Sequence, residues 1–393
     1  MTPGPIYLDH NATTPPSAAV VDAMLSHMTR TWANASSQHE AGQAARVALG
    51  QARARVARML NCRPNEVVFT SGATEANHMA LRGAVGFNGR GALVASAGEH
   101  AGVLKLLSQL QADAVPVARI GLRADGQLDL DQARALISDA VSLVSVMAAN
   151  NETGVLMPIG ELARLAHAAG ALLHVDATQL VGKLPFDFAA SGADLVSVSA
   201  HKFHGPKGIG ALLVRQGLNW PALFPGAQER GRRAGTENLP GVAGFAAAAE
   251  ALTLSPEVWL ARASGMAHLR DRLEAGLQRA LPGVVVYGAT APRLPNTSYL
   301  RVGRLHADQV LAQLDRLGVM ASSGSACSAG GLAASPVLTA MGVPRDEAVC
   351  AVRFSLSADT TASEVDHVLS HLPGALMPLM AASDPVSPPG VFA

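Results

Sequence analysis

The chain alternates between two hydrophobic patterns from about residue 40 onward. Stretches with apolar residues at helical spacing, such as 41–60 and 159–169, are followed by short apolar runs without polar alternation. We predict that these runs are buried strands: 66–70, 92–96, 141–149, 171–177, 194–202 and 209–215. Strands of this kind, separated by helices, are typical of a mainly parallel sheet covered on both faces. The pattern therefore predicts an α/β fold.

The pattern changes near residue 254. A helix of small residues over 241–254 is followed by a linker-like LSP segment and by a long helix over 259–280. Beyond it, short strands alternate with helices, which indicates a smaller α+β domain; the strands are 284–287, 296–302 and 351–357. We predict four parts: an N-terminal segment 1–14 that packs with the small domain, a large domain 15–255, a small domain 256–380 and a disordered Pro-rich tail 381–393.

Composition and charge narrow the function classes. Hydrophobic residues make up 49% of the chain, which argues against a disordered or low-complexity protein. Thirty basic and thirty acidic residues give a formal net charge of zero, which disfavours a nucleic-acid binder with a strongly basic face. The sequence shows no signal peptide and no apolar stretch long enough for a bilayer. We therefore predict a cytoplasmic protein that binds neither nucleic acid nor membrane.

The cysteines and lysines are both sparse. Cys62, Cys327 and Cys350 supply neither a disulfide framework nor a CxxC metal motif, so we predict a reducing compartment and no metal site. Lysine occurs only four times, whereas the other 26 basic residues are Arg. Arg stays protonated, but a buried Lys can lose its proton and act as a nucleophile. Each lysine therefore raises the question of whether an amine is needed there; the four are Lys105, Lys183, Lys202 and Lys207.

Polar residues follow the predicted strands of the large domain. In an open α/β sheet, ligands bind beyond the carboxyl ends of the strands. The segment SGATEAN places 71–74 at a turn into a helix, where backbone N–H groups and the helix dipole can hold a phosphate. An ordinary helix cap is the alternative interpretation. The other residues at strand ends are Glu99, His100, Asn150, Asn151, Asp176, Gln179, Ser199, Ala200, His201 and Lys202.

Two of these residues indicate a particular cofactor. Lys202 follows a strand beside His201 and His204, which is compatible with an amine bound to an aldehyde cofactor; a surface lysine is the alternative. Asp176 ends an apolar run, where a buried carboxylate needs a partner. A protonated pyridine nitrogen would be that partner and would make the ring a stronger electron sink. The set predicts pyridoxal phosphate.

Eight motifs in order resemble the cysteine desulfurases, in the nitrogen-fixation and iron–sulfur-assembly group of the class V aminotransferase family. The similarity covers about residues 6–370. The motifs are YLDHNATTP (7–15), SGATEAN (71–77), NNETG (150–154), HVDATQ (174–179), SAHKFHGPKGIG (199–210), GRRAGTEN (231–238), SSGSAC (322–327) and VRFSLS (352–357). The resemblance implies the type I fold of pyridoxal-phosphate enzymes, with a seven-stranded, mainly parallel sheet in the cofactor-binding large domain. It also implies a homodimer that removes sulfur from L-cysteine.

The resemblance also implies roles for individual residues. Lys202 would hold the cofactor and move the substrate α-proton, and His100 would stack on the ring. Cys327, on a loop of the small domain, would take the sulfur as a persulfide and leave alanine. The implied cofactor contacts are Ala73, Thr74, Asn151, Asp176, Gln179, Ser199, His201, Lys202 and, from the second subunit, Thr236. Substrate contacts would come from Arg353, Asn34 and Asn151.

Local sequence bears on several of these assignments. Cys327 lies in a run of small residues, ASSGSACSAGG, that would pack poorly as core, whereas Cys62 and Cys350 adjoin apolar runs. Arg353 has the fork geometry for a bidentate contact with a carboxylate, although an ordinary ion pair is an alternative. A Gly-rich surface turn is the alternative for the segment of Thr236, and a structural histidine is the alternative for His100.

Two departures from the family affect the partner. The family usually has Glu-Pro-Ser after the cysteine, whereas this chain continues SAGGLAASPVL, and its tail lacks the longer polar extension that meets a scaffold protein. The sulfur would pass to iron–sulfur cluster assembly or to another acceptor, and the sequence does not identify that acceptor. The rival interpretations are another class V enzyme, such as an aminotransferase or a selenocysteine lyase, and a non-catalytic dimeric binding module. Cys327 argues against the aminotransferase, because transamination needs no thiol.

Overall fold

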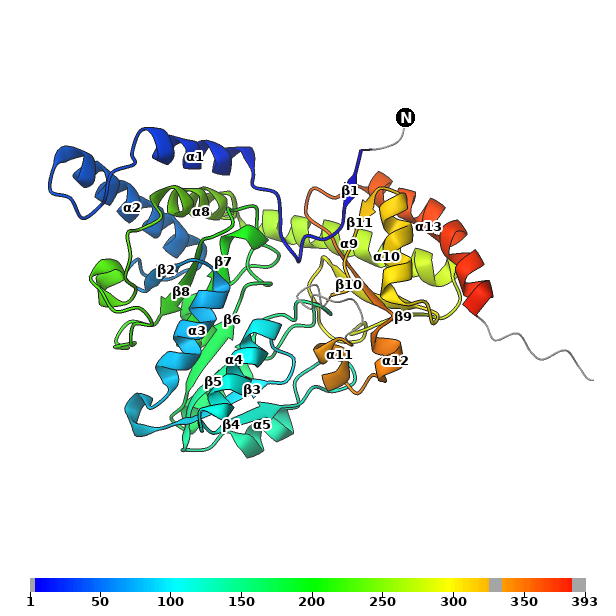
Figure 1. Cartoon of the computed structure of the whole chain (residues 1–393), viewed down its shortest axis with the longest axis horizontal. Coiled ribbons are helices and arrows are strands. Elements are labelled where there is room, and N and C mark those ends of the chain that lie inside the picture. The colour runs from blue at the N-terminus through cyan, green and yellow to red at the C-terminus, as the bar shows by residue number, and fades with distance from the viewer. Residues whose placement is uncertain (1–3, 325–333, 384–393) are drawn as a thin grey trace, which may run out of the picture.

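The large domain is built on one seven-stranded sheet, with strand order β2-β8-β7-β6-β5-β3-β4 (Figure 1). The computed structural model describes residues 4–324 and 334–383. Within it, neighbouring strands from β7 to β4 pair in parallel, and β8 pairs antiparallel with both β7 and β2. The strands are β2 (Val67–Thr70), β3 (Ala92–Ser96), β4 (Val117–Ile120), β5 (Val141–Met147), β6 (Leu172–Asp176), β7 (Leu195–Ser199) and β8 (Gly210–Val214). The predicted α/β class and its mainly parallel sheet are confirmed.

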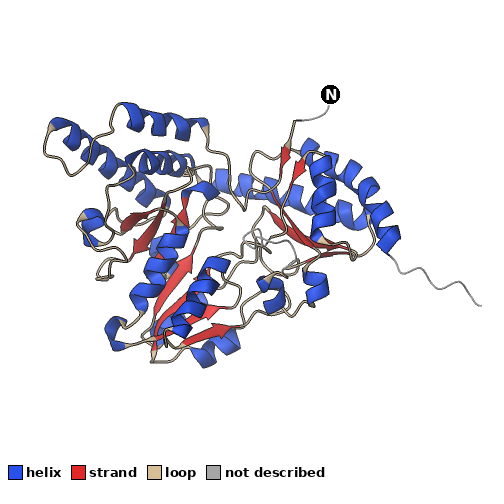
Figure 2. Cartoon of the chain, viewed as in Figure 1, coloured by secondary structure: helices blue, strands red, loops and turns tan. Residues whose placement is uncertain are grey.

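Helices cover both faces of this sheet, as the unbroken apolar strands predict (Figures 1 and 2). Successive residues of a strand point to opposite faces, so Leu212 belongs to one hydrophobic cluster and Leu213 to the other. One face is packed by α3 (Ala73–Ala84) and α4 (Ala101–Ala112). The other face is packed by α2 (Glu40–Met59), α6 (Ile159–Ala168) and α8 (Leu239–Ala251). Around them lie α1 (Ala18–Thr29), α5 (Leu130–Leu136), α7 (Phe188–Ser191) and the 3₁₀ turns η1 (Phe87–Gly89), η2 (Ala200–Lys202) and η3 (Gln228–Gly231).

The C-terminal part has its own sheet and its own hydrophobic cluster. Its three antiparallel strands have the order β12-β10-β9, and a short parallel pair joins β1 to β11. The N-terminal Ile6 and Leu8 are buried in this same cluster. The strands are β1 (Ile6–Tyr7), β9 (Val284–Val286), β10 (Thr297–Val302), β11 (Val319–Met320) and β12 (Ala351–Ser355). The helices are α9 (Pro256–Ala280), α10 (Ala307–Arg316), α11 (Pro336–Ala340), α12 (Arg345–Ala348) and α13 (Ala362–Ser383). We keep 1–14, 15–255 and 256–380 as proposed boundaries.

One feature was not predicted from the sequence, and a second differs from the prediction. Strand β8 runs against its neighbours, because only 200–209 separate it from β7 and a parallel crossover needs a dozen or more residues. Helix α13 continues to Ser383, so 381–383 are helical rather than part of a disordered tail; Leu376, one turn earlier, anchors the helix in the small-domain cluster. The rest of the predicted tail lies outside the described residues. None of the helices in the described chain is long and apolar enough to cross a membrane.

Candidate active site

The carboxyl ends of the parallel strands open into one cavity of about 470 Å³. The turns after β2, β5, β6 and β7 all supply lining residues, as expected for a doubly wound sheet. The structure therefore brings together most of the residues predicted from the sequence. These are Ala73, Thr74, His100, Asn151, Asp176, Gln179, Ser199, His201 and Lys202.

One end of the cavity is formed by the start of helix α3. Gly72 is the N-cap of α3 and makes no side-chain cap, so the first-turn N–H groups are directed at this end of the cavity. The turn lies tightly on β8. A Cβ at Gly210 would be 2.5 Å from the carbonyl oxygen of Val198 and 2.7 Å from the Cα of Gly72, so this position requires glycine. The arrangement is suited to an anionic group such as a phosphate.

Asp176 lies at the end of β6 with both carboxylate oxygens held. Its Oδ2 accepts a hydrogen bond of 2.7 Å from the side chain of Asn77, and its Oδ1 accepts one of 3.0 Å from the backbone N–H of Thr178. The residue is 3% exposed. Hydrogen bonds to the ionised form compensate for burying a carboxylate. Asp176 is thus fixed as a buried acceptor facing the cavity.

Lys202 ends the 3₁₀ turn after β7 and projects into the same cavity. Its Nζ donates to the backbone carbonyl oxygens of Asn11 (2.6 Å) and Ala12 (2.8 Å). The N-terminal segment therefore crosses the mouth of the large-domain sheet and touches the amine. Beside it, burial and the neighbouring lysines 202, 207 and 183 lower the pKa of His201 to about 4, so this imidazole is neutral near pH 7.

His100 is the N-cap of α4, and this contact defines its tautomer. Its Nδ1 accepts a hydrogen bond of 3.1 Å from the backbone N–H of Gly102. Because Nδ1 acts as an acceptor, the proton of the neutral ring is on Nε2. Burial lowers the pKa of His100, an effect that Asp176 opposes and Lys202 reinforces. His100 is therefore a neutral imidazole at neutral pH, with its ring on the cavity wall.

Arg353 lies next to the cavity rather than in its lining. On β12 its guanidinium pairs with Asp9 (2.9 Å) and donates to the carbonyl oxygen of Asn151 (2.8 Å) and to the hydroxyl of Ser322 (2.9 Å). The ion pair that was the alternative interpretation is thus present. The Nε atom is buried and has no hydrogen-bond partner within the described part of the chain. Arg353 is thus hydrogen-bonded directly to Asn151, which does line the cavity.

Besides Arg353, two predicted residues of the described chain, Asn34 and Thr236, do not line the cavity. Asn34 is exposed between α1 and α2, where its side chain caps the backbone N–H of Ser36. Thr236 is exposed in the turn before α8. Cys327 lies outside the described residues. Of the other cysteines, Cys350 is buried and Cys62 is half-buried.

The sequence analysis missed several side chains around the cavity. Asn77 sits one turn into α3, inside the motif that was assigned only to phosphate. Its position could have been predicted, because it lies about one helical turn beyond the start of the helix. At that spacing the side chain faces the sheet again. Asn11 and Thr13 had no comparable signal, since their contacts with Lys202 and His201 join segments about 190 residues apart.

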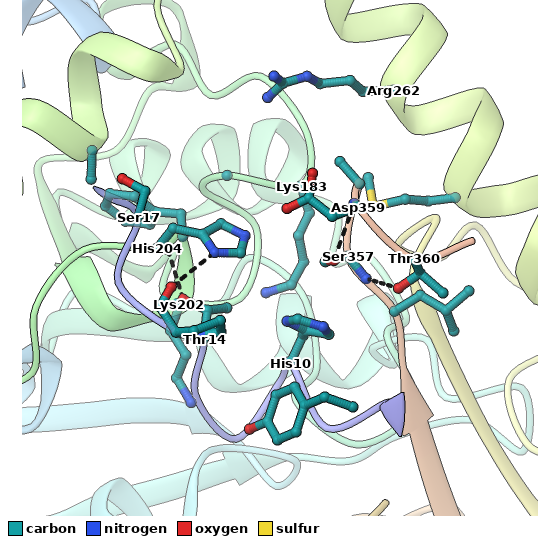
Figure 3. Close-up of a pocket in the computed structure, with 18 of the residues that line it drawn as sticks. His10, Thr14, Ser17, Lys183, Lys202, His204, Arg262, Ser357, Asp359 and Thr360 are labelled. Atoms are coloured by element: carbon teal, nitrogen blue, oxygen red, sulfur yellow. Dashed lines mark hydrogen bonds between the residues drawn. The ribbon is translucent and has the colours of Figure 1, made fainter. Parts of the chain in front are cut away.

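A second cavity of about 480 Å³ lies between the large domain and the C-terminal part. Figure 3 shows that His10, Lys183, Arg262 and Asp359 face it from different elements. Lys202 lines both cavities. The segment 10–17 also contributes to both, so it forms a shared wall.

Known proteins identify the family. The model of the family "Aminotransferase class-V" matches residues 6–368. A cysteine desulfurase of Rhodobacter capsulatus is 46% identical over 383 residues, which cover 96% of this chain and 98% of that protein. A solved "NifS-like protein" has a TM-score of 0.87 at 32% identity and covers 95% of this chain and 99% of its own. The structure titled "SspA in complex with cysteine" has a TM-score of 0.79 at 29% identity, with coverage of 91% and 100%.

This chain therefore belongs to the class V aminotransferase family and, within it, to the cysteine desulfurases. The resemblance seen in the sequence motifs is confirmed over nearly the whole chain.

Proposed function

We propose that this chain removes sulfur from L-cysteine with pyridoxal phosphate and passes it, as a persulfide on Cys327, to an acceptor. The observation that carries the proposal is the position of Lys202 and Asp176 on the walls of one cavity that ends at the α3 N-terminus. An amine, a carboxylate and an anion-binding helix start are the three groups that this cofactor needs. The comparison that bears on the substrate is a similar solved protein in complex with cysteine.

The residues present fit this cofactor. Buried polar atoms of the cavity residues Asn77, Asn151 and Thr178 have no hydrogen-bond partner within the described chain, so the cavity walls offer unused polar contacts. When bound, pyridoxal phosphate supplies an aldehyde and a ring that withdraws electrons from the substrate α-carbon. We propose that the phosphate is held by Ala73, Thr74, Ser199 and His201, that Asp176 holds the ring-nitrogen proton, and that Gln179 and Asn151 contact the ring oxygen or the substrate.

The chain's own residues would move the protons. Of the two lysines that line the cavity in the described chain, Lys202 comes just after strand β7 and Lys207 is exposed, so we assign to Lys202 the covalent attachment and the transfer of the substrate α-proton. His100 keeps a neutral ring with its proton on Nε2, which makes it a flat stacking surface and a possible proton donor without adding charge. Asn77 and the backbone N–H of Thr178 orient the carboxylate of Asp176 through their hydrogen bonds.

We assign the substrate carboxylate to Arg353, with Asn151 beside it and Asn34 as a further contact. Arg353 is 2% exposed, and a buried guanidinium makes strong charge-assisted bonds. After the bonds to Asp9, Asn151 and Ser322, its Nε–H and the second N–H of Nη1 are left as donors.

Replacing Arg353 with Ala should raise the KM for L-cysteine about 10- to 100-fold while pyridoxal phosphate stays bound. The charge-assisted hydrogen bonds that are lost contribute roughly 1.5 to 3 kcal/mol each. Steady-state kinetics and the visible spectrum measure the two effects. The matched control is Arg301→Ala on the adjacent strand β10, whose ion pair with Glu347 lies outside the cavity. An unchanged KM in Arg353→Ala would move the role to another residue.

We also propose a homodimer in which Thr236 reaches the cofactor phosphate of the other subunit. Thr236 is exposed and outside its own cavity, which is what a contact across an interface requires. Helix α1 adds an exposed apolar stripe at helical spacing that continues past its end: Val21 (51% exposed), Leu25 (57%), Met28 (56%) and Trp32 (72%). Contiguous apolar surface of this kind marks an interaction site.

Leu25→Glu should convert the dimer into a monomer, because it places a charge in the centre of the apolar stripe that the proposed dimer interface covers. Sedimentation velocity gives the mass of each species. Leu260→Glu, which changes a more exposed leucine (71%) on α9, serves as the control and should remain dimeric. If the wild type itself sediments as a monomer, the shared site is wrong.

The proposed function is tested by incubating the holoenzyme with L-cysteine and measuring sulfide, with reductant, and alanine. Equal amounts of both products are expected. Transfer of an amino group to a keto acid without sulfide release would favour the aminotransferase, and turnover of L-selenocysteine alone would favour the selenocysteine lyase. The cytoplasmic location and the acceptor, whether a scaffold of iron–sulfur cluster assembly or another protein, stay predictions.

A further inference from the structure

Lys183 is a buried lysine to which the proposed mechanism gives no task. It follows β6 in the turn that begins at Gln179 and is 5% exposed. Figure 3 shows its side chain extending along the wall of the second cavity toward His10. An ammonium group is costly to bury unless it is hydrogen-bonded, so the position of this amine needs an explanation.

The amine of Lys183 contacts the active-site residue Gln179. Its Nζ lies 2.9 Å from Oε1 of Gln179, which lines the proposed cofactor cavity. Burial, together with Lys202 and Arg353, lowers the pKa of Lys183, whereas the hydrogen bond that its Nζ donates to Oε1 favours the ammonium form. An ammonium group has three donors and no acceptor, so in this form it requires the oxygen end of the amide. The amide nitrogen is thereby turned to the other side, where Nε2 donates to the carbonyl oxygen of Asn11 at 3.0 Å.

The same carbonyl oxygen links this contact to the catalytic lysine. Asn11 O also accepts a hydrogen bond of 2.6 Å from Nζ of Lys202. Three hydrogen bonds therefore join the two lysines, through the Gln179 side chain and the backbone of Asn11. Reversing the amide would place its NH₂ group against the ammonium and its oxygen against a carbonyl oxygen. Both contacts would be repulsive.

The neighbouring His10 is not a second positive charge beside the Gln179 amide. Burial, together with His204 and Lys183, lowers the pKa of His10 to about 4, so its ring is neutral near pH 7. The amide nitrogen of Gln179 carries two N–H groups, and the bond to Asn11 uses one of them. The other is a donor for a ligand in the cavity.

We propose that Lys183 is a positioning residue that fixes the side-chain amide of Gln179 with its nitrogen toward the cofactor cavity. The inference rests on the proposed function, in which Gln179 meets the ring oxygen of pyridoxal phosphate. That oxygen is an anionic acceptor, so it is stabilised by an N–H group and repelled by a carbonyl oxygen. Lys183 acts from the second cavity and does not itself touch the cofactor.

The test is a double-mutant cycle on the holoenzyme with Lys183→Met and Gln179→Ala. Two quantities are measured: the dissociation constant of pyridoxal phosphate, and the pH midpoint at which the visible absorption of the bound cofactor changes. Each single variant should weaken cofactor binding about tenfold, the loss expected for one charge-assisted hydrogen bond, and should shift the midpoint. Adding Lys183→Met to Gln179→Ala should change neither quantity further, because Lys183 acts only through the amide. Lys105→Met, at an exposed lysine of α4, is the matched control and should behave as wild type.

Several results would overturn the inference. Wild-type affinity and midpoint in Lys183→Met would show that Gln179 needs no support. Effects that multiply in the double variant would show that Lys183 acts by another route. If Lys183→Met does not fold, Lys183→Gln replaces it. A neutral amide both donates and accepts, so the new side chain no longer defines the orientation of the Gln179 amide. Wild-type affinity and midpoint in Lys183→Gln would contradict the inference. Failure of the wild type to bind pyridoxal phosphate at all would instead contradict the proposed function.

Discussion

Lys202→Ala should lose covalently held cofactor and reduce sulfide release about 10²- to 10⁴-fold, the usual contribution of a positioned proton-transfer group. The amine lies at the end of β7, held by two backbone carbonyl oxygens of the N-terminal segment. Among the described lysines, Lys183 faces the second cavity, and Lys207 lines the same cavity as Lys202 but is exposed and does not directly follow a strand. Borohydride reduction followed by digestion and mass spectrometry locates the attached cofactor.

The control for this result is Lys105→Ala, which changes an exposed lysine of α4 and should keep both the colour and the activity. In the wild type, the reduced cofactor should be found on the peptide that contains Lys202. Its appearance on a peptide with Lys183 or Lys207 would show that the attachment site is assigned to the wrong amine.

The sheet and the residues at its edge were predictable because both depend on local patterns. Each buried strand is a short apolar run, and the proposed site residues Asp176 and Lys202 lie at the end of a strand or within three residues of it. Chemistry at the carboxyl edge of a parallel sheet can therefore be read from residues adjacent in sequence. The antiparallel direction of β8 was also encoded, in the short connection 200–209, but apolar runs alone do not reveal strand direction.

The rest of the site depends on contacts between distant segments. Asp9 pairs with Arg353, and Asn11 contacts both Lys202 and Gln179, although hundreds of residues separate some of these partners. No periodicity or turn signal encodes such pairs. They arise because Ile6 and Leu8 of the N-terminal segment are buried in the small-domain cluster, and the residues that follow them along the chain cross to the large domain. The contact proposed for Thr236 is harder still to predict from the sequence, since its target lies in another copy of the chain.

The described ends of the segment that carries Cys327 are both attached beside the cofactor cavity. On one side, Ser322 accepts a hydrogen bond from Arg353, which also bonds to Asn151. On the other side, the hydroxyl of Ser335 donates to the carboxylate of Glu152, the residue after Asn151. The two attachments therefore meet at one point of the cavity wall, next to the proposed substrate carboxylate.

Cys327→Ala should keep the yellow cofactor and still bind L-cysteine, but sulfide release should fall to background. In the proposed mechanism, binding and cofactor chemistry belong to Lys202, Asp176 and Arg353, whereas removal of sulfur needs a thiolate that attacks the substrate sulfur. The attack forms the S–S bond of a persulfide on Cys327 and breaks the bond between the substrate sulfur and its carbon. The electron pair of the broken bond stays with the substrate carbon, which takes up a proton and leaves as part of alanine. Mass spectrometry of wild type after brief exposure to L-cysteine should place one added sulfur on the peptide with Cys327.

Cys62→Ala and Cys350→Ala are matched controls that should remain active, because neither thiol is suited to the attack. Burial, with Glu66 nearby, raises the pKa of Cys62 to about 12, so almost none of it is thiolate at neutral pH. Burial also raises the pKa of Cys350, and its Sγ donates to the carbonyl oxygen of Asp346 at 3.2 Å. A thiol held in this way can neither reach the cavity nor deliver sulfur to an acceptor. Added sulfur on Cys62 or Cys350, or wild-type desulfuration by Cys327→Ala, would therefore contradict the proposed sulfur path.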